Sequence, residues 1–196
     1  MAETETGLRL RLYKLLLDKY SSLINEKETK TVGEIKALVN SEDLTIQGIA
    51  SAHRPENYEF GAHYLQAAES AYNFICGEIS YIPSELGLDI WLAPKEILSA
   101  KIADDSDLAV LLCSVLYALG DEKAEVVVAE LENANTHAFA ITEFEGKFIL
   151  LDPAQKRPFM EFSGEKEKVL GQYSFNGAKI RHFLYKFNAQ NYEQFV

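Results

Sequence analysis

The stretch from Lys101 to Gly120, with the sequence KIADDSDLAVLLCSVLYALG, constrains the fold more than any other part of this chain. It begins with side chains that accept hydrogen bonds from the free N–H groups of a helix N-terminus: Asp104, Asp105, Ser106 and Asp107. Apolar residues then follow on nearly every side of a helical projection: Leu108, Leu111, Leu112, Val115, Leu116 and Leu119. Gly120 stands where a left-handed residue commonly ends a helix. The pattern predicts a buried central helix whose N-terminus is crowded with carboxylates.

The size and composition of the chain are those of a globular protein. Its 196 residues fit one domain, or one domain with a helical extension. Hydrophobic residues make up 47% and charged residues 25%, which argues against extensive disorder. The formal net charge of −11 leaves no basic surplus to neutralise phosphates, so we expect no nucleic-acid partner. Residues 1–30 hold six Lys and Arg against five Asp and Glu, so the remainder carries about −12.

Signals for membrane insertion and export are not found in the sequence. No apolar run reaches the roughly 18 residues of a membrane span. The start, MAETETGLRLRLYKLLLDKY, lacks the continuous apolar region and small-residue cleavage site of a secretory signal. Cys76 and Cys113 lie in apolar helical patterns without metal-type spacing, so we expect reduced core cysteines of a cytoplasmic protein. The sequence is also compatible with a disulfide between them.

Apolar residues recur with helical spacing in the first part of the chain and with the alternating or continuous spacing of strands after Gly120. This order predicts an α+β fold, with helices first and an antiparallel sheet after them. Helices are expected at 7–25, 32–39 (with a capping box of Thr31 and Glu34), 58–77 and 94–100, and strands at 124–131, 136–144, 147–152 and 180–188. Residues 40–57 are expected to be irregular or weakly helical, and residues 153–178 to be turn-rich. We expect residues 1–57 to form a helical extension on a domain of residues 58–196. Acidic residues are interspersed in the basic amphipathic helix at 7–25, which favours docking on the core over a membrane surface.

One histidine has a carboxylate partner within reach. His137 begins the strand at 136–144, and Asp152 ends the neighbouring strand at 147–152. Side chains on adjacent antiparallel strands are cross-strand neighbours, and a carboxylate there would orient the imidazole and stabilise its charged form. The other three histidines, His53, His63 and His182, are expected to be structural or solvent-facing. A His–Asp pair alone is also compatible with a purely structural role.

The run from ISY at residue 79 to LDPA at residue 154 resembles the transglutaminase-like superfamily, whose fold is that of papain-like cysteine proteases. The resemblance covers about residues 70–155. Three segments match the family's helix: Asp107-Leu108-Ala109, Leu111-Leu112 and Ala118-Leu119-Gly120. It implies that His137 and Asp152 are the histidine and aspartate of a Cys-His-Asp triad.

The chain departs from the family pattern at the nucleophile. The family has Gly-Asp-Cys before the helix, whereas this chain has Ala103-Asp104-Asp105, which puts Asp105 in the place of the cysteine. A carboxylate is a much weaker nucleophile toward amides than a thiolate. Cys113 lies eight residues further along, roughly 12 Å down the helix, and cannot substitute. Aspartate does preserve a negative charge at the helix N-terminus, so we predict that His137 lies between Asp105 and Asp152 with a raised pKa.

Three interpretations of the site remain open. In the first the three residues are a structural remnant, in the second they belong to a non-catalytic binding module, and in the third they form an unconventional or metal-assisted site of an altered hydrolase or amidase. In the last case Asp105, His137 and Asp152 would be the metal ligands, with Asp104 or Asp107 adding oxygens. Trp91 and Asp104 are candidates for lining a cleft, although Trp91 also fits a core position. The favoured function is a pseudoenzyme without cofactor that binds a protein, peptide or small molecule. The sequence indicates no oligomeric state.

Overall fold

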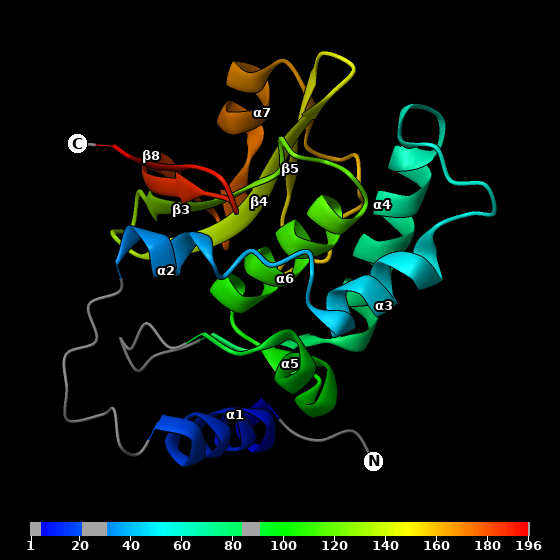
Figure 1. The fold of residues 1–196 in the computed structure, drawn as a ribbon. Helices are drawn as coiled ribbons and strands as arrows, with labels where there is room; N and C mark the ends of the chain where they lie inside the picture. Colours follow the sequence, from blue (N-terminus) through cyan, green and yellow to red (C-terminus); the bar gives the residue numbers. More distant parts are fainter. Residues whose placement is uncertain (1–4, 21–30, 84–90, 196) are drawn as a thin grey trace.

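The computed structural model describes residues 5–20, 31–83 and 91–195, and within these it has an α+β architecture (Figure 1). The helices are α1 (Glu5–Tyr20), α2 (Val32–Lys36), α3 (Leu44–His53), α4 (Phe60–Glu78), α5 (Pro94–Ala100), α6 (Asp105–Ala118) and α7 (Lys166–Gln172). The side chains of Thr31 and Glu34 form the predicted capping box at the start of α2.

In the described part of the chain, the central sheet is antiparallel and has seven strands. In spatial order β6 (Ser163–Gly164), β5 (Lys147–Leu151), β4 (Thr136–Phe144), β3 (Glu125–Leu131), β8 (Ala178–Phe187) and β7 (Ser174–Phe175) follow one another, and β9 (Tyr192–Gln194) pairs with β8. The predicted hairpin turn between β4 and β5 has positive φ at both Glu145 and Gly146. Two further strands, β1 (Ser80–Tyr81) and β2 (Ile102–Ala103), form a separate parallel pair that joins the end of α4 to the start of α6.

The sheet lies between two hydrophobic clusters. α6 covers one face, and α7 covers the other (Figure 1). The larger cluster joins α6 to α3, α4 and α5, with Tyr64, Tyr72 and Ile75 among its buried side chains. The smaller cluster lies under α7 and includes Phe139, Leu150, Val169 and Tyr173. This two-sided burial explains why β3 to β5 are apolar on both faces.

The central helix α6 is buried nearly all round, as its sequence predicts. Buried positions run without a break from Asp107 to Leu116. Gly120 follows the C-terminus with a φ of 99°, a conformation that glycine adopts without strain. A Cβ atom at this position would come within 3.2 Å of Cδ2 of Phe60. The glycine is therefore required both by the backbone and by the approach of α4.

The structure differs from the sequence prediction in two segments. Residues 44–53 form a regular helix where an irregular or weakly helical segment was expected, because the Asp43 carboxylate caps its first turn and Ile46, Ile49 and Ala50 are buried. The segment at 153–178 contains β6, α7 and β7 as well as turns. Its helix has a charged sequence, KEKVLGQ, in which only Val169 is buried, so hydrophobic periodicity gives almost no signal.

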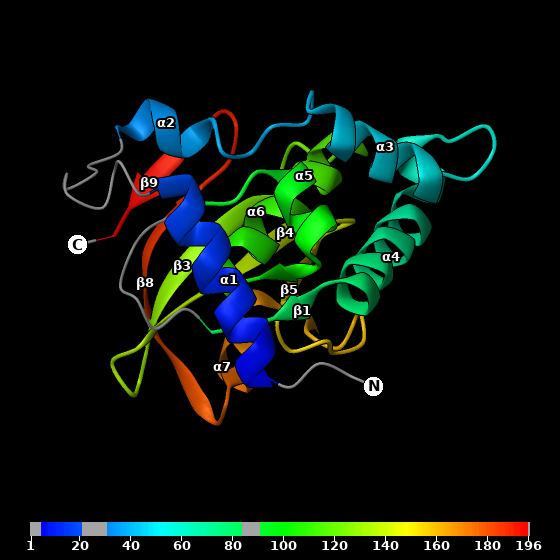
Figure 2. The same ribbon diagram turned by 90° about the horizontal axis from the view of Figure 1, so that it is seen from below.

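The N-terminal helix α1 packs on the same core as the rest of the chain. Figure 2 shows α1 lying across the rest of the fold. Leu12 and Leu16 are buried in the larger cluster, and the Arg11 guanidinium donates to the carbonyl of Ala100 at 3.0 Å. Residues 21–25 of the predicted helix lie outside the described residues. The domain boundary at residue 57 stays a prediction. Within the described ranges, no helix is long and apolar enough to cross a membrane.

Candidate functional site

The N-terminus of α6 presents a set of aspartates with distinct roles. Asp104 is the N-cap residue, and its carboxylate accepts the backbone N–H of Asp107 at 2.9 Å. Asp107 is buried and accepts the N–H of Leu92 at 2.8 Å, which fixes the segment before α5 to the helix. Asp105 points the other way, toward the sheet, where its Oδ2 accepts the N–H of Ala138 in β4 at 2.9 Å. The cap and the sheet contact together set the position of the Asp105 carboxylate.

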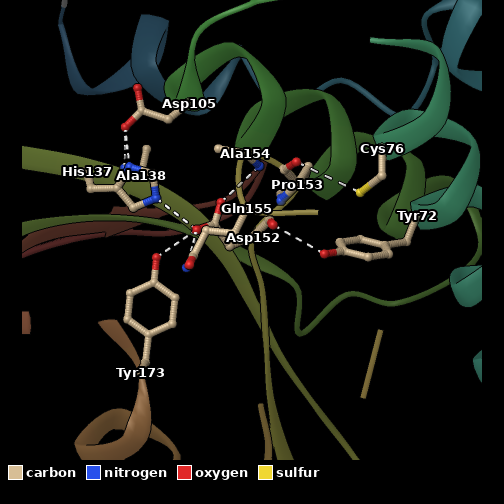
Figure 3. Close-up of polar contacts among 10 residues, drawn as sticks. All are labelled: Tyr72, Cys76, Asp105, His137, Ala138, Asp152, Pro153, Ala154, Gln155 and Tyr173. Atoms are coloured by element: carbon tan, nitrogen blue, oxygen red, sulfur yellow. Dashed lines mark hydrogen bonds and ion pairs between the residues drawn. The ribbon is translucent and has the colours of Figure 1, made fainter. Parts of the chain in front are cut away.

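The imidazole of His137 lies between two carboxylates (Figure 3). Its Nδ1 is 2.7 Å from Oδ2 of Asp105, and its Nε2 is 3.0 Å from Oδ2 of Asp152. His137 is only 1% exposed, whereas the Asp105 side chain is 19% exposed. The three side chains thus form a row that starts near the surface and ends in the interior.

The two contacts of the imidazole differ in geometry. Nε2 makes an aligned hydrogen bond with Asp152. At Nδ1 the distance to Asp105 is that of an ion pair, but the contact lies off the direction of the ring N–H, so this buried nitrogen has no aligned hydrogen bond. The contact of Asp105 with the ring is therefore close but less directional than that of Asp152.

Asp152 is held more firmly than Asp105. Its Oδ1 accepts the N–H of Ala154 at 3.0 Å. Besides His137, its Oδ2 accepts from the Tyr173 hydroxyl at 2.8 Å and from the Gln155 amide at 3.0 Å. Its backbone carbonyl accepts from the Tyr72 hydroxyl at 3.2 Å. This network, visible in Figure 3, fixes the carboxylate that orients the ring.

An aromatic side chain covers the imidazole. The ring of Phe175, in β7, stacks on His137 with centroids 3.6 Å apart and planes 14° from parallel. Tyr81 in β1 packs against the edge of Phe175, with centroids 6.0 Å apart. The stacking of a cationic imidazole on an aromatic face is favourable. Phe175 also shields the imidazole of His137 from water.

The electrostatics of the site favour a charged His137. Burial by itself lowers the pKa of His137, but hydrogen bonding and charge from Asp105 and Asp152 outweigh it and raise the pKa to about 9. Burial raises the pKa of Asp105, and the contacts with His137 and with the N–H of Ala138 outweigh that effect and lower it. At neutral pH the pair is an imidazolium next to a carboxylate.

The two residues predicted to line a cleft lie in other surroundings. Trp91 packs against Phe187 and lines a hollow of about 290 Å³ with α5 and α6, and Asp105, His137 and Asp152 are not among its lining residues. Asp104 is the helix cap described above. Their role in a cleft stays a prediction.

The cysteines lie away from the imidazole as free thiols. Cys113 is buried, and burial raises its pKa. Cys76 contacts the carbonyl of Pro153 at 3.9 Å, and burial raises its pKa to about 11. Neither thiol has the lowered pKa of a nucleophile.

Sequence reasoning missed four residues of the site. Phe175 and Tyr173 reach His137 and Asp152 from a segment without a recognisable motif. Tyr81 and Gln155 lie within or next to the runs that carry the family resemblance, which assigns them no role, and they contact Phe175 and Asp152. One local signal exists for Phe175. Asn176-Gly177 after it is a typical two-residue hairpin turn, and both residues have positive φ. The turn indicates the hairpin, but not what it covers.

The N-terminus of α6 faces a His–Asp pair on antiparallel strands, as the resemblance to the transglutaminase-like superfamily implies. This chain belongs to that family, because the family model of the transglutaminase-like domain matches residues 27–176. Among solved structures, calcium-bound LapG of Legionella pneumophila is similar with a TM-score of 0.52 and 14% identity, covering 91% of this chain and 87% of that one. Another LapG structure has a TM-score of 0.50 and 16% identity, covering 82% and 89%. Curated protein sequences give no match. At these identities the structural likeness shows the fold alone.

Proposed function

We propose that this protein is a transglutaminase-like pseudoenzyme, in which Asp105 takes the place of the family's nucleophilic cysteine and which acts by binding or scaffolding. The observation that carries the proposal is the enclosure of His137. Its two nitrogens contact carboxylates, one ring face is covered by Phe175, and the residue is 1% exposed.

The charge of the ring argues against proton abstraction. A general base must be neutral, and with a pKa of about 9 only about 1% of the imidazole is neutral at pH 7. In a cysteine enzyme the histidine does not have to abstract a proton during the attack, because its ion-pair partner is already a thiolate, which is the nucleophile. Here the anion is a carboxylate, and its attack on an amide would form an anhydride.

The metal-assisted alternative has no support from the geometry. Asp105 and Asp152 contact opposite nitrogens of the ring, so the three side chains do not converge on one point. Among the described residues, no three His, Cys, Asp or Glu side chains form a group suited to a metal ion. These observations therefore do not favour a metal-assisted hydrolase.

A thiol probe tests the position of Asp105 without knowledge of a substrate. In the variant Asp105→Cys, the imidazolium of His137 and the helix N-terminus should lower the thiol pKa, so that iodoacetamide labels it at pH 6. Ser106→Cys, one residue along the same helix, is the matched control and should label slowly. Labelling of both at the same rate, or no effect of adding His137→Ala to the first variant, would contradict the proposal.

The effect of replacing Asp105 on the free energy of unfolding tests whether the site is kept for stability or for catalysis. Residues kept for catalysis often reduce stability, so their replacement stabilises an enzyme. Replacement of one partner of a structural ion pair has the opposite effect, so Asp105→Asn should lower the free energy of unfolding by about 3 kcal/mol. Urea denaturation at pH 7 measures the difference. A more stable Asp105→Asn variant, or turnover of a glutaminyl peptide by the natural protein that His137→Ala abolishes, would show that the site is an active one.

A further inference from the structure

One edge of the sheet is open for a short distance in the described structure. β3 pairs with β8 from Ile180 to Phe187 on one side. On the other side β7 pairs with Ala178 and Lys179, and β9 pairs with residues 185–187. No described strand pairs with residues 180–183 on this side, which lies at the margin of the sheet between β9 and the β7–β8 hairpin (Figure 2). The backbone groups that point outward there are a template for another strand.

A hollow of about 730 Å³ runs along this open edge. Its lining residues are Ile180, Arg181, His182 and Phe183 of β8, Lys166, Leu170 and Gly171 of the α7 region, and Phe195. Successive side chains of a strand point to opposite faces, so four consecutive residues can line one hollow only if it follows the edge of the strand. The hollow and the open edge are therefore one surface, which we call the β8 edge groove.

The chemistry of the β8 edge groove differs from that of the whole molecule. Leu170, Ile180, Phe183 and Phe195 give it an apolar lining. Lys166 and Arg181 add positive charge, and none of its lining residues is acidic, in a chain of net charge −11. Glu130 pairs with one guanidinium nitrogen of Arg181 at 2.7 Å, while the Arg181 side chain is 62% exposed. A guanidinium has further N–H donors for a second carboxylate.

We propose that the β8 edge groove binds an extended acidic peptide of a partner protein, which adds as a strand to residues 180–183. Backbone hydrogen bonds to the edge would give affinity, and alternate side chains would give specificity. Alternating apolar and acidic residues fit, because one set faces the apolar lining under α7, with Lys166 beside it, and the other set faces Arg181 on the opposite side of the sheet. The inference rests on the proposed binding role and names the surface and the class of partner.

The test uses the full chain and a synthetic library of acetylated hexapeptides in which Glu alternates with Val, Ile, Leu or Phe. Peptide is added to millimolar concentration, and backbone amide shifts are followed by NMR. We expect saturable shifts at residues 180–183 and in α7, with an affinity that falls as salt rises. A library with Lys in place of Glu should bind at least about fivefold more weakly.

Two matched comparisons separate strand addition from unspecific charge attraction. Lys166→Glu should weaken binding of the Glu library by about fivefold, whereas Lys168→Glu should not. Lys168 is on the same helix, pairs with Glu165 at 2.7 Å and does not line the groove. N-methylation of alternate peptide amides removes one row of donors at a time, so only one of the two methylated sets should lose binding.

The outcomes that overturn the proposal are distinct. Absence of saturable shifts at millimolar peptide, equal binding of the Lys library, or equal loss with both methylated sets excludes strand addition by an acidic peptide. Shifts at the same amides that depend on protein concentration alone would assign the groove to a second copy of this chain. None of these results bears on the Asp105→Cys labelling, so failure here is distinguishable from failure of the pseudoenzyme proposal.

Discussion

At the scale of single residues, the site is governed by competition between burial and charge. His137 is surrounded by protein, which alone would favour the neutral ring, yet two carboxylates contact its nitrogens and reverse the outcome. The two contacts are unequal, since Asp152 is aligned and rigidly held while Asp105 is near the surface. Each carboxylate should therefore affect the titration of the ring in its own way.

NMR titration of the His137 ring tests this balance. We expect a pKa of about 9 for the natural protein. Asp105→Asn removes one negative charge and should lower the pKa by about one unit or more, because a neighbouring charge shifts a pKa by one to three units. A His137 pKa at or below about 6.5, the ordinary value, would contradict the charged ring.

A second buried carboxylate, Asp121, tests the cost of an unsatisfied acceptor. Its Oδ2 accepts from the hydroxyls of Tyr64 and Thr142, and its Oδ1 accepts the N–H of Lys123. Tyr64→Phe removes one donor from a buried anion and should lower the free energy of unfolding by about 2 kcal/mol. Tyr117→Phe, whose hydroxyl bonds to the carbonyl of Glu122 at the surface, should cost less than about 0.5 kcal/mol. Equal losses in urea denaturation would show that the carboxylate is satisfied in another way.

At the scale of elements, the end of α6 depends on one glycine. Gly120→Ala introduces a side chain at a φ of 99° and within 3.2 Å of Phe60, so we expect a loss of about 2 kcal/mol. Gly48→Ala in α3 is the matched control. A Cβ there meets nothing within 4 Å, and alanine should stabilise the helix by about 0.5 kcal/mol. Thermal denaturation of both variants measures the contrast, and a stabilising Gly120→Ala would contradict it.

The elements that the sequence could predict are those with dense local signals. α6 has caps at its start, an apolar body and a terminal glycine, and β4 and β5 have a positive-φ turn between apolar runs. The register of these strands then brings His137 and Asp152 together. The fold class and the row of three side chains follow from these signals and from the family resemblance.

The remaining features depend on contacts distant in sequence. α7 is a charged helix stabilised on the sheet by Val169 and by its neighbours, so its own pattern is weak. The stacking of Phe175 on His137 depends on how the β7–β8 hairpin lies across the start of β4. The short parallel pair of β1 and β2 joins residues more than twenty positions apart. No local propensity encodes such contacts.

At the scale of the whole molecule, the site makes stability depend on pH. The folded pKa of His137 lies above that of the unfolded chain, so its contribution is complete below about pH 6.5 and is lost as pH rises toward 9. The folded pKa of Asp105 lies below that of the unfolded chain. Its contribution to the free energy of unfolding is therefore lost in acid, as pH falls below about 4. Between these limits the pair contributes on the order of 3 kcal/mol.

Urea denaturation from pH 5 to pH 10 checks the alkaline limb. The difference in free energy of unfolding between the natural protein and His137→Gln should be constant to about pH 6.5 and then decline by on the order of 3 kcal/mol. Taking the difference removes the contribution of other titrating groups. A difference that stays flat to pH 10 would mean that the ring is neutral in the folded protein.

The bonds of Asp152 have a consequence for how the molecule opens. Its carbonyl is held by Tyr72 in the larger cluster, and its carboxylate is held by Tyr173 in the smaller one. One residue thus links the packing on both faces of the sheet. Amide hydrogen exchange in α7 should therefore require opening of the whole domain, despite the few buried contacts of that helix. In Asp152→Ala, α7 should exchange as a separate, less stable cooperative unit.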